Sequence, residues 1–253
     1  MNSLETASII FGCSFGAGLL GIVLHVKLPD EHLDASTKDV VKLVMGLIAT
    51  MAALVLSLLI ASGSSSYQGQ ENEVRSISAN VILLDRLLSF YGPDAKEARA
   101  LLKQGVAAVH DRIWSPDGTT AADLDPEATK GVADTFMDSL ERLSPKTDSQ
   151  SALKSQAMQI AQNLGQTRLM MFEQSGSSIS WPFLTVLVFW ICMLFLGFGL
   201  FARLNATVTV TLFIGSISVA GAIFLILELS APYQGFMRIS DIPLRGALAI
   251  IGR

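Results

Sequence analysis

"MGLIATMAALVLSLLIASGSSSYQGQ", residues 45–70, is the stretch of sequence that decides the fold. It carries no charged residue and is longer than the roughly 20 mainly apolar residues that a helix needs to cross a bilayer. With two preceding residues it forms an uncharged run over 43–70, and three other runs without Asp, Glu, Lys or Arg reach a similar length, at 6–26, 174–202 and 204–227. The sequence therefore predicts an all-α, multi-pass membrane protein with four transmembrane helices.

The composition agrees with a membrane protein. Of 253 residues, 51% are hydrophobic and 16% are charged, and the mean hydropathy is +0.49. These values are too apolar and too poor in charge for an ordinary soluble domain. The leading residues contain Glu5 and no Lys or Arg, and no small-residue cleavage site follows the apolar run. We therefore expect the first span to be a mature transmembrane helix and not a secretion signal.

Four crossings place both termini and the central segment on one side of the membrane. Basic residues near the membrane ends are equally frequent on the two sides, so the positive-inside rule barely separates the two orientations. The central segment contains no cysteine, and it has no strand-and-disulfide character, which favours a cytoplasmic location. We therefore expect the protein in the cell inner membrane, with the termini and the central segment in the cytoplasm.

The chain divides into four predicted parts: transmembrane helices one and two (1–61), a helical domain (62–180), transmembrane helices three and four (181–230) and an interfacial tail (231–253). In the first helix of the domain, apolar residues alternate steps of three and four, typical of a coiled-coil seam: Val74, Ile77, Val81, Leu84, Leu88 and Tyr91. Gly92-Pro93 ends this run. No proline lies between 57 and 91, so the second membrane helix can continue through it, making residues 39–91 a rod of roughly 80 Å.

Three further helices are predicted in the domain. Asp94 can cap the first, whose apolar side runs from Ala98 to Ile113 and which stops at the turn sequence of 115–118; residues 119–124 form a loop. Asp125-Pro126 predicts the start of the second. Its buried side is Val132, Phe136, Leu140 and Leu143, and the last helix covers about 148–174.

The second membrane helix carries a stripe of small residues. Leucines lie elsewhere on the helical wheel, and the stripe consists of Gly46, Thr50 or Ala49, Ala53, Ser57, Ala61 and Ser64. Small residues allow close helix packing, which is the interpretation the pattern alone favours. Alternatively, copies from several subunits surround a pore in which the hydroxyls of Thr50, Ser57, Ser62 and Ser64 replace hydration water.

Charged residues near the membrane ends each have two interpretations. Arg75 and Arg86 lie 11 residues apart, about three turns, so they would form two cationic rings in an oligomer. The alternative is a local Glu71 to Arg75 pair and a solvated Arg86. Glu228 ends the fourth span, where an ionisable group either requires a partner or lies at the level of the headgroups.

The tail interleaves apolar residues with Arg238, Arg245 and Arg253, which favours an interfacial segment whose Arg238 and Arg245 contact anionic lipid. Gly12 and Gly16 form a GxxxG pair that indicates close helix contact. Cys13 and Cys192 are interpreted as small hydrophobes, and the isolated residues His25, His32 and His110 have no catalytic role.

No enzyme motif is present in the sequence. It contains no GxGxxG, Walker loop, HExxH or Gly-x-Ser-x-Gly pattern, and no nucleophile and base that could converge. We therefore expect a protein that is not an enzyme, with no cofactor, no metal and no nucleic acid partner.

Several short motifs point together to a known family. They are GLIATMAALVLSLLIAS (46–62), Glu73-Val74-Arg75, Asn80, LLDRLL (83–88), YGP (91–93) and Glu228-Leu229 followed by Pro232, Gly235, Arg238, Ser240, Pro243 and Leu244. In these motifs nearly the whole chain resembles the bacterial DUF4239 family of bestrophin-like membrane proteins. The resemblance implies a distant relationship to bestrophins, which are pentameric anion channels with a second-helix pore and a helical cytosolic domain. The chain departs from a bestrophin in lacking a Phe-rich constriction on the stripe and in having a net acidic domain, and it has Ser230 where family members often have Asp.

Two functions follow as hypotheses. The first is a homo-oligomeric, pentameric channel for chloride or other small anions in the lipid bilayer. Its pore would be lined by Gly46, Thr50, Ala53, Ser57, Ala61 and Ser64, with Arg75 and Arg86 at the cytosolic mouth. The second is a non-conducting scaffold or sensor that acts through its helical domain.

Overall fold

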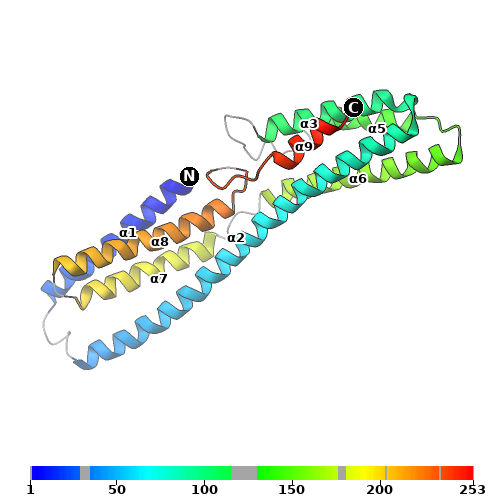
Figure 1. Ribbon diagram of the computed structural model, residues 1–253. Helices are drawn as coiled ribbons and strands as arrows, with labels where there is room; N and C mark the ends of the chain where they lie inside the picture. Colours follow the sequence, from blue (N-terminus) through cyan, green and yellow to red (C-terminus); the bar gives the residue numbers. More distant parts are fainter. Residues whose placement is uncertain are drawn as a thin grey trace. The chain divides into compact units, whose positions relative to one another are not determined.

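The computed structural model describes residues 2–28, 35–114, 130–175, 181–202, 204–233 and 235–252. Within these ranges the chain is helical and has no strand (Figure 1). The helices are α1 (Ser3–Lys27), α2 (Ala35–Tyr91), the short 3₁₀ helix η2 (Pro93–Ala95), α3 (Lys96–Ile113), α5 (Lys130–Glu141), α6 (Asp148–Ser175), α7 (Trp181–Leu200), α8 (Ala206–Leu229) and α9 (Ile242–Ile250). The predicted turn at 115–118, the loop at 119–124 and the Asp125-Pro126 cap lie outside the described residues.

The chain forms two compact units. The membrane unit contains Met1–Ser65 and Ile179–Ser230, and the helical domain contains Ser66–Ser178 and Ala231–Arg253. Helix α2 is continuous from one into the other, which confirms the prediction that the second membrane helix does not stop at the membrane end. Its 57 residues correspond to a length of about 85 Å.

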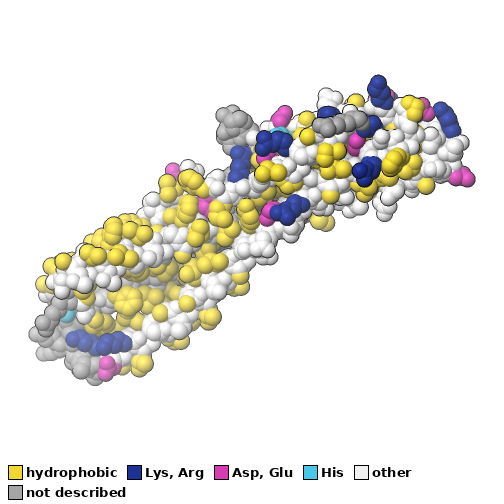
Figure 2. Space-filling model, in the orientation of Figure 1, with side chains coloured by type: hydrophobic (Ala, Val, Ile, Leu, Met, Phe, Trp, Pro, Cys, Tyr) yellow, Lys and Arg dark blue, Asp and Glu magenta, His cyan; other side chains and the backbone are white. Residues whose placement is uncertain are grey.

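In the membrane unit, α1, α7, α8 and the first part of α2 are each long and apolar enough to cross a membrane, as the sequence predicted. Each contributes to one buried cluster, for example through Ile10 of α1, Ala52 of α2, Leu187 of α7 and Ile223 of α8. Figure 2 shows hydrophobic side chains gathered over α1 and α8, whereas charged side chains are spread over the helical domain. Phe213 of α8 packs edge-on against two phenylalanine rings of α1.

Glycines make a very close contact between α1 and α7 in this unit. A Cβ added at Gly21 would lie 2.8 Å from the Leu200 nitrogen, and one at Gly199 would lie 3.0 Å from the Ile22 nitrogen. Gly12 and Gly16 make no close helix contact with the described residues of their own subunit, because a Cβ at either glycine would meet no described atom within 4 Å. Contact with another copy of the chain stays a prediction. These two glycines lie on an exposed part of α1, whereas the crossing point is nearer its C-terminal end.

The helical domain contains the second part of α2 together with α3, α5, α6 and α9. The predicted seam is confirmed: Ile77 is half-buried, and the other five of its residues are buried. The helix ends where the sequence predicted, because Gly92 has φ of 113°, a conformation that L side chains rarely adopt, and Pro93 follows.

The start of α3 differs from the prediction. Asp94 does not cap this helix, because Pro93 begins a 3₁₀ turn and the N-cap falls on Ala95, which makes no side-chain cap. The Asp94 carboxylate instead accepts a hydrogen bond of 2.9 Å from Lys146, which raises the pKa of the lysine through the bond and the opposite charge. Further along, Phe136 and Leu140 are buried as expected, and α6 begins at Asp148.

Candidate pore-lining surface

The membrane part of α2 has one face that packs inside its unit and a wider face that does not. Met45 lies against Gly197 of α7, and a Cβ at Gly63 would lie 3.3 Å from the Leu229 Cβ of α8. Ala52 is buried between these two points. Only 11% of the most apolar window of α2 is buried, compared with 28–33% for the other three helices. Helix α2 is therefore the least covered membrane helix of the described chain.

The stripe of small residues lies on the uncovered face. Gly46, Thr50, Ala53, Ser57 and Ala61 are exposed. Ser64 is half-buried, as is Ala49, the alternative to Thr50. A Cβ at Gly46 would meet nothing within 4 Å among the described residues. Among the described residues, these small side chains therefore pack closely against no other helix of the subunit, which leaves packing against another copy and the lining of a pore as the two interpretations.

A second stripe of bulky residues lies beside the first and is exposed too. Its members are Leu43, Leu47, Leu54 and Leu58, with exposed fractions from 61% to 75%. Two neighbouring stripes of different size, both without a partner in the described chain, leave room for contact with lipid or with other copies of the helix. The hydroxyl of Thr50 donates a hydrogen bond of 2.8 Å to the Leu47 carbonyl oxygen, so it is satisfied inside its own helix.

The two predicted arginines lie on the part of α2 that belongs to the helical domain, 11 residues or about three turns apart. Both arginines are exposed. Arg75 donates a hydrogen bond of 2.6 Å to Glu71, so the local pair that was the alternative interpretation is formed. Arg86 makes no ion pair with any described residue.

Glu228 is buried near the end of α8, with 3% of its surface exposed, and it takes part in a polar interaction. A location at the headgroup surface, one of the two predictions for this residue, does not fit such burial. The other prediction, that the acid requires a partner, agrees with it. Two residues further on, the Ser230 hydroxyl donates a hydrogen bond of 2.8 Å to the Ile226 carbonyl oxygen.

The tail belongs to the same compact unit as the helical domain. Five of its apolar residues are buried, Tyr233, Ile239, Leu244, Ala247 and Ile251, whereas Phe236, Met237, Ile242 and Ile250 are exposed. Its predicted location at the membrane interface stays a prediction. Two hydrogen bonds join the tail to the end of α3. The Trp114 indole nitrogen donates to the Ile239 carbonyl oxygen at 2.9 Å, and Arg238 of the tail donates to the Ile113 carbonyl oxygen at 2.9 Å. The sequence pattern was amphipathic as predicted, but the apolar side meets α2 and α3.

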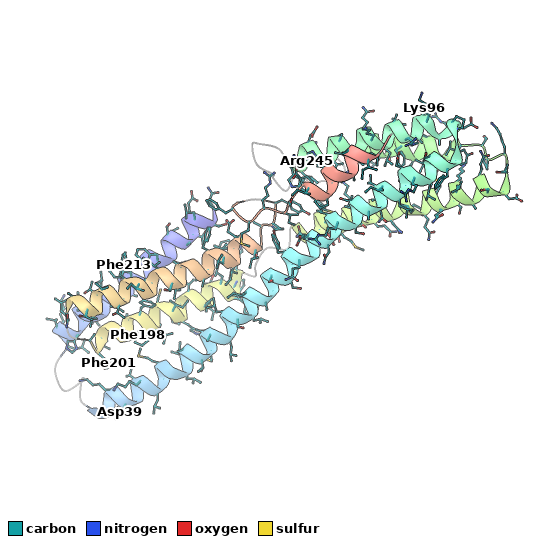
Figure 3. The ribbon with its side chains drawn as sticks, viewed as in Figure 1. Asp39, Lys96, Phe198, Phe201, Phe213 and Arg245 are labelled. Atoms are coloured by element: carbon teal, nitrogen blue, oxygen red, sulfur yellow. The ribbon has the colours of Figure 1, made fainter. Side chains whose placement is uncertain are left out.

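One polar cluster fastens the beginning of α9. Asp241 accepts hydrogen bonds from His110 at 3.3 Å and from Arg245 at 3.2 Å. Burial alone would raise the pKa of Asp241, but these two partners outweigh it and lower the pKa below its ordinary value. The Arg245 side chain is otherwise exposed on α9 (Figure 3). Lipid contact by Arg238 and Arg245 stays a prediction.

A buried ion pair in the domain was missed at the level of sequence. Asp85 has 7% of its surface exposed, and its carboxylate accepts hydrogen bonds from Nε and Nη2 of Arg99 at 2.8 and 2.9 Å. The hydrogen bond to Asp85, more than the charge, raises the pKa of Arg99 against the opposing effect of burial. Asp85 also accepts the Gly252 amide at 3.3 Å, so the pair anchors the tail. The one sequence cue was an acid inside an apolar seam.

The remaining histidines and cysteines have ordinary surroundings where they are described. His25 bonds the Leu200 carbonyl oxygen at 2.8 Å, and His32 lies outside the described residues. Cys13 and Cys192 are free thiols. The described ranges contain no group of three His, Cys, Asp or Glu side chains that could hold a metal ion.

Comparison with known proteins gives one consistent answer. A family model described as a Bestrophin-like domain matches residues 12–244. A crystal structure of a variant of a bacterial bestrophin homologue from Klebsiella pneumoniae matches with a TM-score of 0.69 and 14% identity, covering 100% of this chain and 96% of that chain. A second variant gives 0.66 and 14%, covering 98% and 97%. The comparison with curated proteins gives no match.

Proposed function

The chain belongs to the bestrophin-like family, and on that premise we propose that it is a homo-oligomeric ion channel whose pore is lined by α2. The observation that carries the proposal is the exposed stripe of small, uncharged residues on α2, Gly46, Thr50, Ala53, Ser57 and Ala61. A single helix cannot enclose a pathway, so several copies of α2 must surround the axis. A pentamer is the assembly that the family resemblance implies.

The stripe suits the wall of a pore for a steric reason. Small side chains leave space at the axis where copies of a helix converge, and hydroxyls such as that of Ser57 can replace part of the hydration shell of an ion. The neighbouring leucines, among them Leu47 and Leu54, offer the bulk that packing between subunits needs. The opposite face of α2 is already occupied by its own subunit.

The exposed arginines favour anions such as chloride as the permeant ions. Arg86 would contribute one full positive charge per subunit to a ring, because it has no ion-pair partner among the described residues. The charge of Arg75 is largely offset by Glu71 at 2.6 Å. We place these rings, with the termini and the helical domain, on the cytoplasmic side of the cell inner membrane.

A matched pair of serine variants tests the pore. Ser57 and Ser62 are both exposed on the same helix, but five residues separate them by about 140° around its axis. Ser62, which the sequence alone counted among the pore hydroxyls, therefore lies off the stripe and is left out of the proposed pore. We expect Ser57→Leu to abolish most of the chloride current of purified protein in planar bilayers and Ser62→Leu to retain it. The oligomeric state of each variant in detergent is measured in parallel, so that a failure of assembly is distinguished from a blocked pore.

Two results would overturn the channel. One is a strictly monomeric protein, and the other is an assembled wild-type protein that conducts neither chloride nor sodium. An assembled but silent protein would favour the non-conducting scaffold or sensor, which acts through the helical domain.

A further inference from the structure

His110 joins α3 to the start of α9 through both nitrogens of its ring. Nδ1 lies 3.0 Å from Oδ1 of Asp111, the next residue of α3, and Nε2 lies 3.3 Å from Oδ2 of Asp241. Asp241 occupies the N-cap position of α9 but makes no cap with its side chain, so its carboxylate is directed to other partners. The His110 side chain is 18% exposed and that of Asp241 25%, so this contact is largely shielded from water.

The protonation of His110 decides how well this arrangement is satisfied. A neutral imidazole has one N–H donor and one nitrogen that only accepts, whereas an imidazolium has two donors. An ionised carboxylate only accepts. In either neutral tautomer, one ring nitrogen would therefore face a carboxylate oxygen lone pair to lone pair. Protonation turns both contacts into charge-assisted hydrogen bonds, which are about twice as strong as neutral ones.

Packing holds the ring in this position. It stacks on the Trp114 indole with a centroid distance of 5.6 Å and an interplanar angle of 23°. That indole is itself fixed by its hydrogen bond to the Ile239 carbonyl oxygen. The face of a tryptophan attracts a positive charge at such a distance, so the stacking also favours the protonated ring.

The other charged groups around His110 do not bind its ring. Arg245 of α9 binds the second oxygen of Asp241 at 3.2 Å, with a side chain that is 67% exposed. On α2 the charge of Glu73 acts on the Tyr233 hydroxyl, and on α6 the Arg168 side chain lines the same cavity as the Trp114 indole. Among the described residues, the hydrogen bonds and ion pairs of the His110 ring are those with its two carboxylates.

Other contacts hold the remainder of the tail on the helical domain. Two turns before His110, Lys103 of α3 donates a hydrogen bond of 3.0 Å to the Ile251 carbonyl oxygen, at the far end of α9. Leu244 and Ala247 of α9 are buried. Loss of the His110 contact would therefore loosen the first turn of α9 and leave the rest of the tail attached.

We propose that His110 is a proton-dependent link, which holds the start of α9 on α3 while its ring is protonated and weakens when the ring loses its proton. Histidine suits this role because its charge changes readily between about pH 5 and pH 8. Although burial opposes it, the hydrogen bonds and charges of His110 and Arg245 lower the pKa of Asp241, so the acceptor stays ionised over this range. The attachment of α9 therefore strengthens as the pH falls and weakens as it rises. The link goes beyond the proposed channel function, because it would be present in a scaffold as well.

Hydrogen exchange of the full-length protein in lipid nanodiscs measures the link. The protection of the α9 amides, corrected for the intrinsic exchange rate at each pH, is compared at about pH 5.5 and about pH 8. We expect protection to be about fivefold greater at the lower pH, as the difference between a charge-assisted and a neutral hydrogen bond allows. Equal protection at the two pH values, or weaker protection at the lower one, would overturn the proposal.

Three variants separate the link from other effects of pH. His110→Gln keeps a side-chain N–H donor but cannot gain a charge, so α9 should be equally protected at both pH values. Asp111→Asn should reduce the pH difference, because its amide can donate to the ring nitrogen that a neutral histidine leaves as an acceptor. Glu97→Gln removes an exposed acid from the first turn of the same helix and should retain the fivefold difference.

The variants also decide against the link if it does not exist. A pH difference that persists at full size in folded His110→Gln or folded Asp111→Asn would refute it, and so would an equal loss in Glu97→Gln. If circular dichroism shows that His110→Gln is misfolded, Asp111→Asn carries the test alone, since its side chain is 81% exposed and its replacement leaves α3 intact.

Discussion

Replacing Gly21 by alanine should destabilise the membrane unit, because the added methyl group collides with the backbone of α7. Its carbon would lie 2.8 Å from the Leu200 nitrogen and 3.0 Å from the Gly199 carbonyl carbon, and closer still to the Leu196 carbonyl oxygen. Ordinary van der Waals contact begins near 3.4 Å. All three obstacles are backbone atoms that cannot rotate away, so relief requires α1 and α7 to separate by roughly 1 Å across a close-packed contact.

The expected loss follows from two opposing terms. Overpacking a well-packed site typically destabilises by about 1–3 kcal/mol, and a collision between backbones belongs at the upper end. Replacing glycine by alanine inside a helix recovers about 1 kcal/mol of helix propensity. The net change in the free energy of unfolding is therefore about −2 kcal/mol, which in a chain of this size lowers Tm by about 4–8 °C.

Gly12→Ala and Gly16→Ala are the matched controls, since they change the same helix where no described atom lies within 4 Å. They should leave Tm unchanged or raise it, because only the gain of about 1 kcal/mol in helix propensity applies. Thermal unfolding followed by circular dichroism in detergent measures all three variants. A Tm for Gly21→Ala at or above that of the wild type would refute the glycine crossing, and an equal loss in the controls would show that the GxxxG pair makes a close contact after all.

Three further predictions concern charged residues. Asp85→Asn should lower the free energy of unfolding of the helical domain by about 2 kcal/mol, because charge-assisted hydrogen bonds to a buried group are lost. Hydrogen exchange at the Gly252 amide should become faster, because that amide loses its acceptor. Asp241→Asn should loosen α9 at neutral pH. Because the folded-state pKa of Asp241 is lowered, its own contribution is complete above its unfolded pKa near 3.8 and disappears only as pH falls through the lower folded value. The difference in hydrogen exchange between wild type and variant should therefore persist at pH 5 and close only below about pH 4; a difference that is absent at pH 5 would contradict this. In the proposed channel, Glu71→Gln should raise the permeability of chloride relative to sodium by releasing the charge of its arginine partner, and Arg86→Gln should lower it; reversal potentials that move in the same direction for both variants would contradict the assignment.

The features that sequence predicted well are those that local chemistry decides. Span length depends only on the number of consecutive apolar residues, so all four membrane helices were identified. The end of α2 depends on a glycine with positive φ followed by a proline, and it was placed at Tyr91. Continuity of α2 followed from the lack of a strong helix breaker between the membrane and the domain.

The features that sequence missed depend on which surface lies opposite. An amphipathic tail has the same pattern whether its apolar side meets lipid or protein, and here Leu244 and Ala247 meet the helical domain. The same limit applies to Asp85, whose burial was detectable in the seam but whose partner could have been any of several arginines. Arg99 becomes its partner because the turn at Gly92 folds α3 back along α2.

The exposed face of α2 was the hardest feature to interpret, since every side of this helix is uncharged in the membrane. The hydroxyls do not decide between a pore and a packing surface, because Thr50 already satisfies its hydrogen bond within the helix and does not require water. The decision is steric. The small stripe and the leucine stripe are adjacent, with Ala53 and Leu54 about 100° apart around the axis. If subunits pack through the leucines, the small residues turn towards the axis and leave it open. If they pack through the small residues, the helices approach closely and the axis is closed. Channel and scaffold therefore bury different stripes of one helix: Ser57→Leu obstructs the axis of an assembled channel, whereas in a scaffold packed through the small stripe it disturbs assembly, which the oligomeric state of the variant reports.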